Sequence, residues 1–166
     1  MTTPSAQTDH GWGMLVDAAS EERESKMLQR YQEMAALSEQ ARTAQMLAMV
    51  RAEYALPDHK LRSFTLSRLR TWLKLEEGTA RAIVTSYDAA MEKIPGQLAM
   101  RRVSLVQTLA REFSADDEEK LRSLVPRVFA GMPSRATIEK SLLAAPSVGS
   151  QTRSPKKRSW WPFGGR

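Results

Sequence analysis

The sequence predicts an all-α fold: a helical bundle of five or six helices with a long N-terminal helix and a disordered, basic C-terminal tail. Apolar residues recur at helical spacing through most of the chain, and no stretch alternates apolar and polar residues as a strand would. Proline and glycine stand where helices should end. We expect a mobile arm over residues 1–19, a helical domain over residues 20–145 and a flexible tail over residues 146–166.

The first helix is expected over residues 20–55, which contain no proline or glycine and are rich in good helix formers. Such a helix would be roughly 50 Å long, whereas a domain of about 100 residues has a radius of gyration near 13 Å. The helix therefore either breaks, near Ser38, or projects and needs a second copy or a helical partner to cover its apolar stripe. The arm before it carries an apolar cluster around Trp12, which either stays mobile or docks on the domain.

Five further helices are expected, over residues 58–75, 80–94, 98–113, 115–130 and 135–145. Asp58 and Ser114 are the predicted N-caps of the first and fourth of these, and three acidic residues after Ser114 suit the positive end of the helix dipole. Pro126 falls inside the fourth and is expected to kink it.

The corner at residues 73–83, LKLEEGTARAI, raises the question of DNA binding. Over roughly residues 69–94 it resembles the corner of helix-turn-helix regulators. It departs from them in having Lys74 where many carry glycine, and in offering Arg81 as one cation among four carboxylates on the helix that would read bases. A structural corner between packed helices is favoured. The alternative is a nucleic-acid-binding transcriptional regulator that uses Lys60, Arg62, Arg68, Arg70, Lys74, Thr79 and Arg81.

Catalytic chemistry has few candidates in this chain. There is no cysteine, and the two histidines are His10, in the N-terminal arm, and His59, at a helix start. No phosphate-cradling glycine loop and no Glu-x-x-His pair occurs. We therefore expect no enzyme activity, no cofactor and no metal. No apolar run approaches the roughly 20 residues of a membrane span, so we expect a cytoplasmic protein that can associate peripherally with a membrane.

The charge of +6 is concentrated in the tail. No acidic residue follows Glu139, and the chain before Arg153 has a net charge of +1. Disordered tails usually lack aromatic residues, yet this one ends in SWWPFGGR. Its aromatic and cationic side chains are therefore candidates for binding a membrane or a partner: Arg153, Lys156, Lys157, Arg158, Trp160, Trp161 and Phe163.

Four interpretations of the tail remain open. Its composition resembles that of short Trp-rich cationic peptides that bind anionic membranes. The stretch SPKK, residues 154–157, resembles basic repeats that lie along the DNA minor groove, and tryptophan can stack on unpaired bases. A protein groove that accepts the aromatic residues is the third interpretation, and a free tail that aids solubility is the fourth.

The functional hypothesis is a non-enzymatic helical interaction or scaffold protein. It would self-associate or bind a protein partner through residues 20–55, and its cationic Trp-rich tail would tether it to an anionic membrane surface or a partner.

Overall fold

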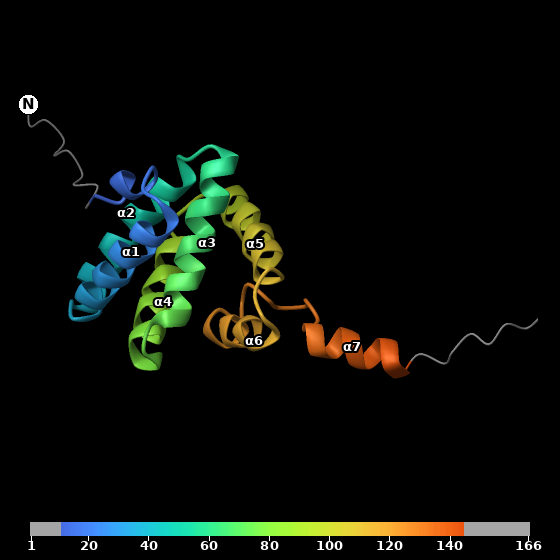
Figure 1. The fold of residues 1–166 in the computed structure, drawn as a ribbon. Coiled ribbons are helices and arrows are strands. Elements are labelled where there is room, and N and C mark those ends of the chain that lie inside the picture. The colour runs from blue at the N-terminus through green and yellow to red at the C-terminus, as the bar shows by residue number, and fades with distance from the viewer. Residues whose placement is uncertain (1–10, 145–166) are drawn as a thin grey trace, which may run out of the picture. The chain divides into compact units, whose positions relative to one another are not determined.

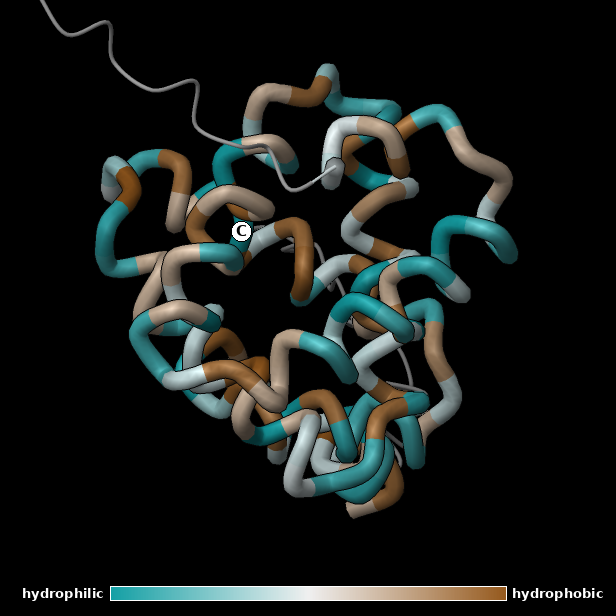
Figure 2. Tube along the Cα trace, turned by 90° about the vertical axis from the view of Figure 1, so that its left-hand side faces the viewer, coloured by the Kyte–Doolittle hydropathy of each residue, from teal (hydrophilic) through white to brown (hydrophobic). Residues whose placement is uncertain are grey.

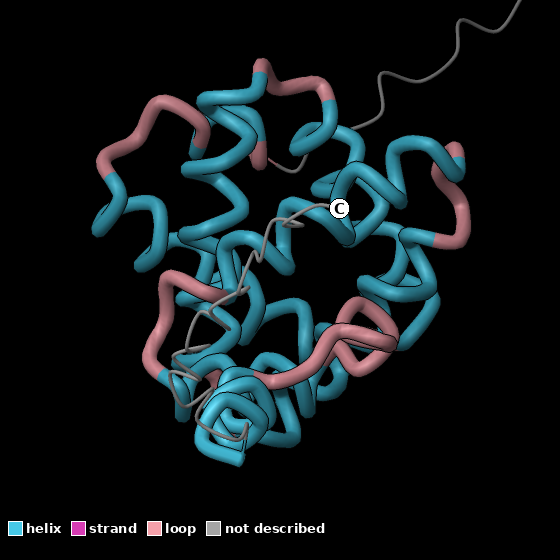
Figure 3. Tube along the Cα trace, turned by 90° about the vertical axis from the view of Figure 1, so that its right-hand side faces the viewer, coloured by secondary structure: helices cyan, strands magenta, loops and turns pink. Residues whose placement is uncertain are grey.

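A computed structural model describes residues 11–144, and all the regular structure in this range is helical (Figures 1 and 3). The all-α prediction is confirmed, and the predicted count of five or six helices is corrected to seven α-helices within these residues. A short 3-10 turn, Gly13–Leu15, precedes them. The α-helices are α1 Ser20–Ala35, α2 Glu39–Tyr54, α3 Asp58–Lys74, α4 Glu77–Met91, α5 Gly96–Ala110, α6 Ala115–Leu124 and α7 Arg135–Ala144.

The long N-terminal helix is a wrong prediction, and its break accounts for the additional helix. The chain turns between Ala35 and Glu39, where Ser38 caps α2 by accepting a hydrogen bond from the Ala41 amide at 3.3 Å. The guanidinium of Arg42, in the first turn of α2, stabilises the bend. It donates to the carbonyls of Ala35 and Leu37, each at 3.2 Å, and to Ser86 Oγ at 2.8 Å. Residues 20–55 therefore form a hairpin of two helices and do not project.

Helices α1 to α4 pack against one another and enclose most of the core (Figure 1). Helices α5 and α6 both pack against α3, and α6 also touches α4. Hydrophobic and hydrophilic residues are interspersed along the helical tube in Figure 2, as expected where one side of a helix faces a core. Each of the helices α1 to α4 contributes large apolar side chains that are buried in this core: Met27, Tyr31, Met46, Met49, Phe64, Trp72, Ile83 and Tyr87.

The N-terminal segment also differs from the prediction. A mobile arm was expected there, but residues 11–19 pack against the helices. Trp12 and Leu15 are each 1 % exposed and belong to the core. Arg23 of α1 ties the segment down, donating to the carbonyls of Leu15 at 2.9 Å, Val16 at 3.0 Å and Ala18 at 2.8 Å. These bonds satisfy buried carbonyl groups that would otherwise be desolvated without a partner. The alternative in which the Trp12 cluster docks is the observed one.

Two helix ends differ in detail from the prediction. Ser114 caps α6 as expected, accepting from the Asp117 amide at 3.1 Å. The helix then ends at Leu124 and is not kinked at Pro126, because the proline ring excludes the helical conformation from the residue before it. Asp58 is the first residue of α3 and not its cap, which is Pro57, and its carboxylate forms an ion pair with Arg101.

The described residues form two units, which divide between Ser134 and Arg135. In the second unit α7 buries none of its residues, and Leu142 and Leu143 are 71 % and 88 % exposed. Within residues 11–144 no helix is both long and apolar enough to cross a bilayer. The predicted tail residues from Arg153 to Phe163 lie outside the described residues, as do His10 and the first part of the predicted arm.

Candidate functional site

The helix-turn-helix-like corner is a tight junction between α3 and α4. Leu75 fills the junction and is 9 % exposed, while Glu76 caps α4 by accepting a hydrogen bond from the Thr79 amide at 3.1 Å. The amides of Gly78 and Thr79 lower the pKa of the Glu76 carboxyl, since they stabilise its charged form. A Cβ atom at Gly78 would stand 3.2 Å from Glu76 Oε2, so glycine suits this capped turn.

The cations predicted to meet a phosphate backbone are engaged with carboxylates of the same chain. Lys60 pairs with Asp17 at 2.6 Å, Lys74 with Glu24 at 2.7 Å, and Arg81 with Glu77 at 2.7 Å. The remaining surface pairs are Arg62 with Glu112 and Arg70 with Glu24. A nucleic acid phosphate would have to compete with each of these carboxylates, which weakens the alternative of a nucleic-acid interface.

Arg68, one of the residues predicted to bind nucleic acid, instead has a fully buried side chain. It lies four residues from Phe64 and four from Trp72, and so stands on the apolar stripe of α3. That spacing is the signal in the sequence that places it inside. Without a rearrangement of the core, Arg68 has no access to a phosphate.

An ionic cluster inside the helical unit was not predicted. It joins Glu53 of α2, Arg68 of α3 and Arg102 of α5, which are 0 %, 0 % and 4 % exposed. Arg68 Nε donates to Glu53 Oε1 at 3.2 Å, and Thr65 Oγ1 donates to the same oxygen at 2.6 Å. The second guanidinium, that of Arg102, lies 3.5 Å from the ring centroid of Tyr87.

The cluster contains two guanidinium groups and one carboxylate, so its formal charge is positive. Burial lowers the pKa of Arg102 to about 9, and the neighbouring positive charge of Arg68 acts in the same direction. Arg102 is still protonated at neutral pH. Its Nε, like Nη1 and Nη2 of Arg68, has no hydrogen-bond partner among the described residues. A buried cation with so few acceptors is costly, and aromatic rings offset part of that cost.

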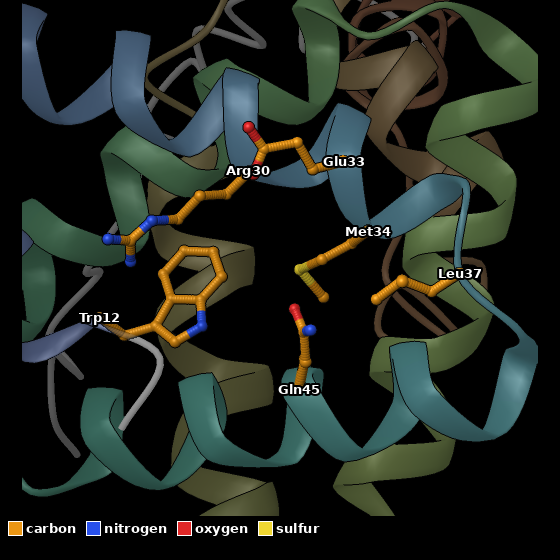
Figure 4. A pocket seen from close by; sticks show the side chains of 6 residues that line it. All are labelled: Trp12, Arg30, Glu33, Met34, Leu37 and Gln45. Carbon is orange, nitrogen blue, oxygen red and sulfur yellow. The ribbon is translucent and has the colours of Figure 1, made fainter. Parts of the chain in front are cut away.

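One pocket lies between α1 and α2 beside the N-terminal segment, with a volume of about 350 Å³ (Figure 4). Gln45 reaches from α2 toward Met34 on α1, and the Trp12 indole forms a wall. Arg30 stacks on that indole, 5.1 Å from its centroid. Both Glu33 and Arg30 line the pocket, so its charges give no preference for an anion over a cation.

Another pocket, with a volume of about 310 Å³, lies among α4, α5 and the loop after α6. Its walls are mostly apolar, and the buried residues Tyr87 and Arg102 connect it with the ionic cluster. Its lining residues are Tyr87, Asp88, Met91, Glu92, Ala99, Arg102, Val103, Arg127 and Val128. Mostly apolar walls with a few polar groups are the usual composition of small-molecule sites.

Metal binding finds no support in the described part of the chain, where no three His, Asp or Glu side chains gather in a group that could hold an ion. Protein-family models, functionally curated proteins and solved structures all give no match to this chain. The class that the fold defines is therefore a small all-helical protein, and its function has to be inferred from its own residues.

Proposed function

We propose that this is a non-enzymatic helical interaction protein whose C-terminal segment, residues 135–166, tethers it to an anionic membrane surface. The distribution of charge supports the proposal. Residues 135–166 contain seven of the 25 Lys and Arg residues and one of the 19 acidic residues, Glu139. The whole net charge of +6 therefore belongs to this segment, and residues 1–134 are neutral. The boundary coincides with the division between the two structural units.

Helix α7 adds apolar surface to the proposed tether. Ile138, Leu142 and Leu143 are 40 %, 71 % and 88 % exposed, and the four-residue spacing of Ile138 and Leu142 places these two on one side of the helix. Exposed leucines next to clustered cations and tryptophans are the combination found in segments that lie at a membrane interface. The aromatic residues Trp160, Trp161 and Phe163 would add further side chains suited to a membrane interface.

The magnitudes show why both components are needed. Four clustered cations contribute roughly 4 kcal/mol near an anionic surface, which corresponds to about millimolar affinity. Full burial of each large apolar side chain adds about 1.5–3 kcal/mol. Membrane binding at micromolar lipid therefore depends on the apolar residues, while the cations select anionic lipid.

Binding of a partner or a second copy through residues 20–55 remains a prediction. The hairpin of α1 and α2 buries Met27, Tyr31 and Met34 within its own unit, so the projecting apolar stripe that motivated it is absent from the structure. A protein partner for the tail is the competing proposal, and the tether experiment separates the two.

Removal of residues 153–166 is expected to abolish binding to anionic vesicles. The measurement is co-sedimentation of the full chain and of the version ending at Thr152 with phosphatidylserine-containing vesicles, with pure phosphatidylcholine vesicles as the control. The full chain should sediment only with the anionic vesicles. Equal sedimentation of both versions with anionic vesicles would exclude residues 153–166 from the tether, and failure of the full chain to sediment with either kind of vesicle would favour a protein partner.

Two matched variants divide the contributions. Replacement of Lys156, Lys157 and Arg158 by glutamine should remove the preference for anionic lipid. Replacement of Leu142 and Leu143 by serine should weaken binding to anionic vesicles by about tenfold or more, because two exposed leucines lose their burial. Unchanged binding of the serine variant would remove α7 from the tether.

A further inference from the structure

The pocket among α4, α5 and the loop after α6 contains a buried cation that has no carboxylate of its own. Arg102 is 4 % exposed, and none of the ion pairs found among residues 11–144 includes it. The carboxylate of the ionic cluster, Glu53, bonds with Arg68 and Thr65. Arg102 is held by the Tyr87 ring and by the sulfur of Met91, to which its Nη1 donates at 2.7 Å.

These partners leave part of the guanidinium unused. A thioether is a weak acceptor, and a guanidinium has five N–H groups suited to a carboxylate or phosphate. Nε of Arg102 and the hydroxyl of Tyr87 have no hydrogen-bond partner among the described residues, and both side chains line the pocket. Two buried polar groups without a partner, one of them on a cation, therefore belong to side chains that line the same pocket.

The remaining walls suit an apolar body. Ala99 and Val103 of α5, Met91 of α4 and Val128 line the pocket, and its volume of about 310 Å³ is at the low end for small-molecule sites. Met91 lines the pocket and contacts Arg102, and its unbranched side chain can change rotamer at low cost to admit an acceptor.

Two carboxylates, those of Asp88 and Glu92, also line the pocket, and both lie near the Arg127 guanidinium. Glu92 forms an ion pair with Arg127 at 3.3 Å on the exposed rim. Burial raises the pKa of Asp88, which favours its neutral form, and Arg127 acts in the opposite direction. Arg127 pairs with Glu92 and lies near Asp88, whereas Arg102 forms no ion pair within residues 11–144, so Arg102 is the cation available to an anion in the pocket.

We propose that this pocket binds a small organic anion with an apolar body, a monocarboxylate being the simplest, and that Arg102 is its counterion. The carboxylate would displace the Met91 sulfur and accept from Arg102 and from the Tyr87 hydroxyl. Its apolar part would lie against Ala99, Val103 and Val128.

Calorimetric titration of the full chain with octanoate, and with 1-octanol as the neutral analogue of the same length, tests the proposal. We expect octanoate to bind at least tenfold more tightly than 1-octanol, since a hydrogen bond to a charged group is involved. Arg102→Met should remove this difference while preserving side-chain volume. Equal affinity of the two probes for the unmodified protein would overturn the proposal.

A second variant keeps the test independent of the stability of Arg102→Met. Ala99→Phe fills the pocket from its wall and leaves both Arg102 and the cationic tail in place, so it separates pocket binding from attraction of octanoate to the tail. It should weaken both probes by tenfold or more. Octanoate binding that survives in Ala99→Phe would place the ligand elsewhere and refute the site.

Discussion

Replacing Glu53 with glutamine is expected to destabilise the folded protein by about 3–5 kcal/mol. Glu53 is the one carboxylate beside two buried guanidinium groups, and it accepts hydrogen bonds from Arg68 at 3.2 Å and Thr65 at 2.6 Å. Glutamine preserves the shape and can still accept from Thr65. The loss therefore reports the charge, because both Arg68 and Arg102 would be left in the core without a counter-charge.

Urea unfolding followed by circular dichroism measures this loss as a free energy of unfolding. Most domains are stable by only 5–15 kcal/mol, so the variant should be measurably unfolded at moderate urea concentrations. Glu77→Gln is the matched control, because it breaks the exposed pair with Arg81 and should cost well under 1 kcal/mol. A loss for Glu53→Gln as small as that of the control would mean that solvent reaches the cluster.

Replacing Trp12 with alanine is expected to cost about 3–5 kcal/mol, the usual range for removing a buried aromatic side chain. Trp12 is 1 % exposed, its ring centroid lies 5.6 Å from that of Tyr31, and the Arg30 guanidinium lies 5.1 Å from the same indole. The indole thus packs against α1 and belongs to the core. Its removal would leave a cavity beside the pocket of about 350 Å³ that it already lines.

The same urea unfolding measurement serves for this variant, and Met14→Ala is its control. Met14 is two residues away in the same segment but is 82 % exposed, so its truncation should change stability by less than about 0.5 kcal/mol. Similar values for the two variants would show that residues 11–19 detach from the helices in solution. A large loss for Trp12→Ala alone would establish that the segment is part of the fold.

The buried cluster around Glu53 was not predicted from the sequence, and the packing of Trp12 was left open. Arg68 and Glu53 are helix formers in their own segments, and neither segment shows that they will meet inside. The spacing of Arg68 relative to Phe64 and Trp72 is a local signal of burial, but Glu53 as its partner is visible only once α2 and α3 are packed. Arg102 lies four residues from both Leu98 and Val106, so the apolar pattern of α5 places it on the buried face, but that pattern does not show which side chains it meets there.

The break after Ala35 likewise depends on both a local signal in the sequence and a contact with a distant helix. Ser38 is a good N-cap and marks one possible break. What fixes the turn is Arg42, which reaches back to two carbonyls of the bend and across to Ser86 on α4. A helix of 35 residues and a hairpin of two helices have nearly the same local propensities, so contacts between distant segments select the hairpin.

The sequence by itself determined the all-helical class, most helix ends and the concentration of charge after residue 134. These properties follow from local chemistry: apolar periodicity, capping side chains, proline and the order of charged residues along the chain. Only the tertiary structure decided that the first helix is two helices, that Trp12 and Arg68 are buried, and that Arg102 lines a pocket and forms no ion pair within the described residues. The physical reason is that burial and pairing of a side chain depend on which helices meet, and that is settled by packing over the whole unit.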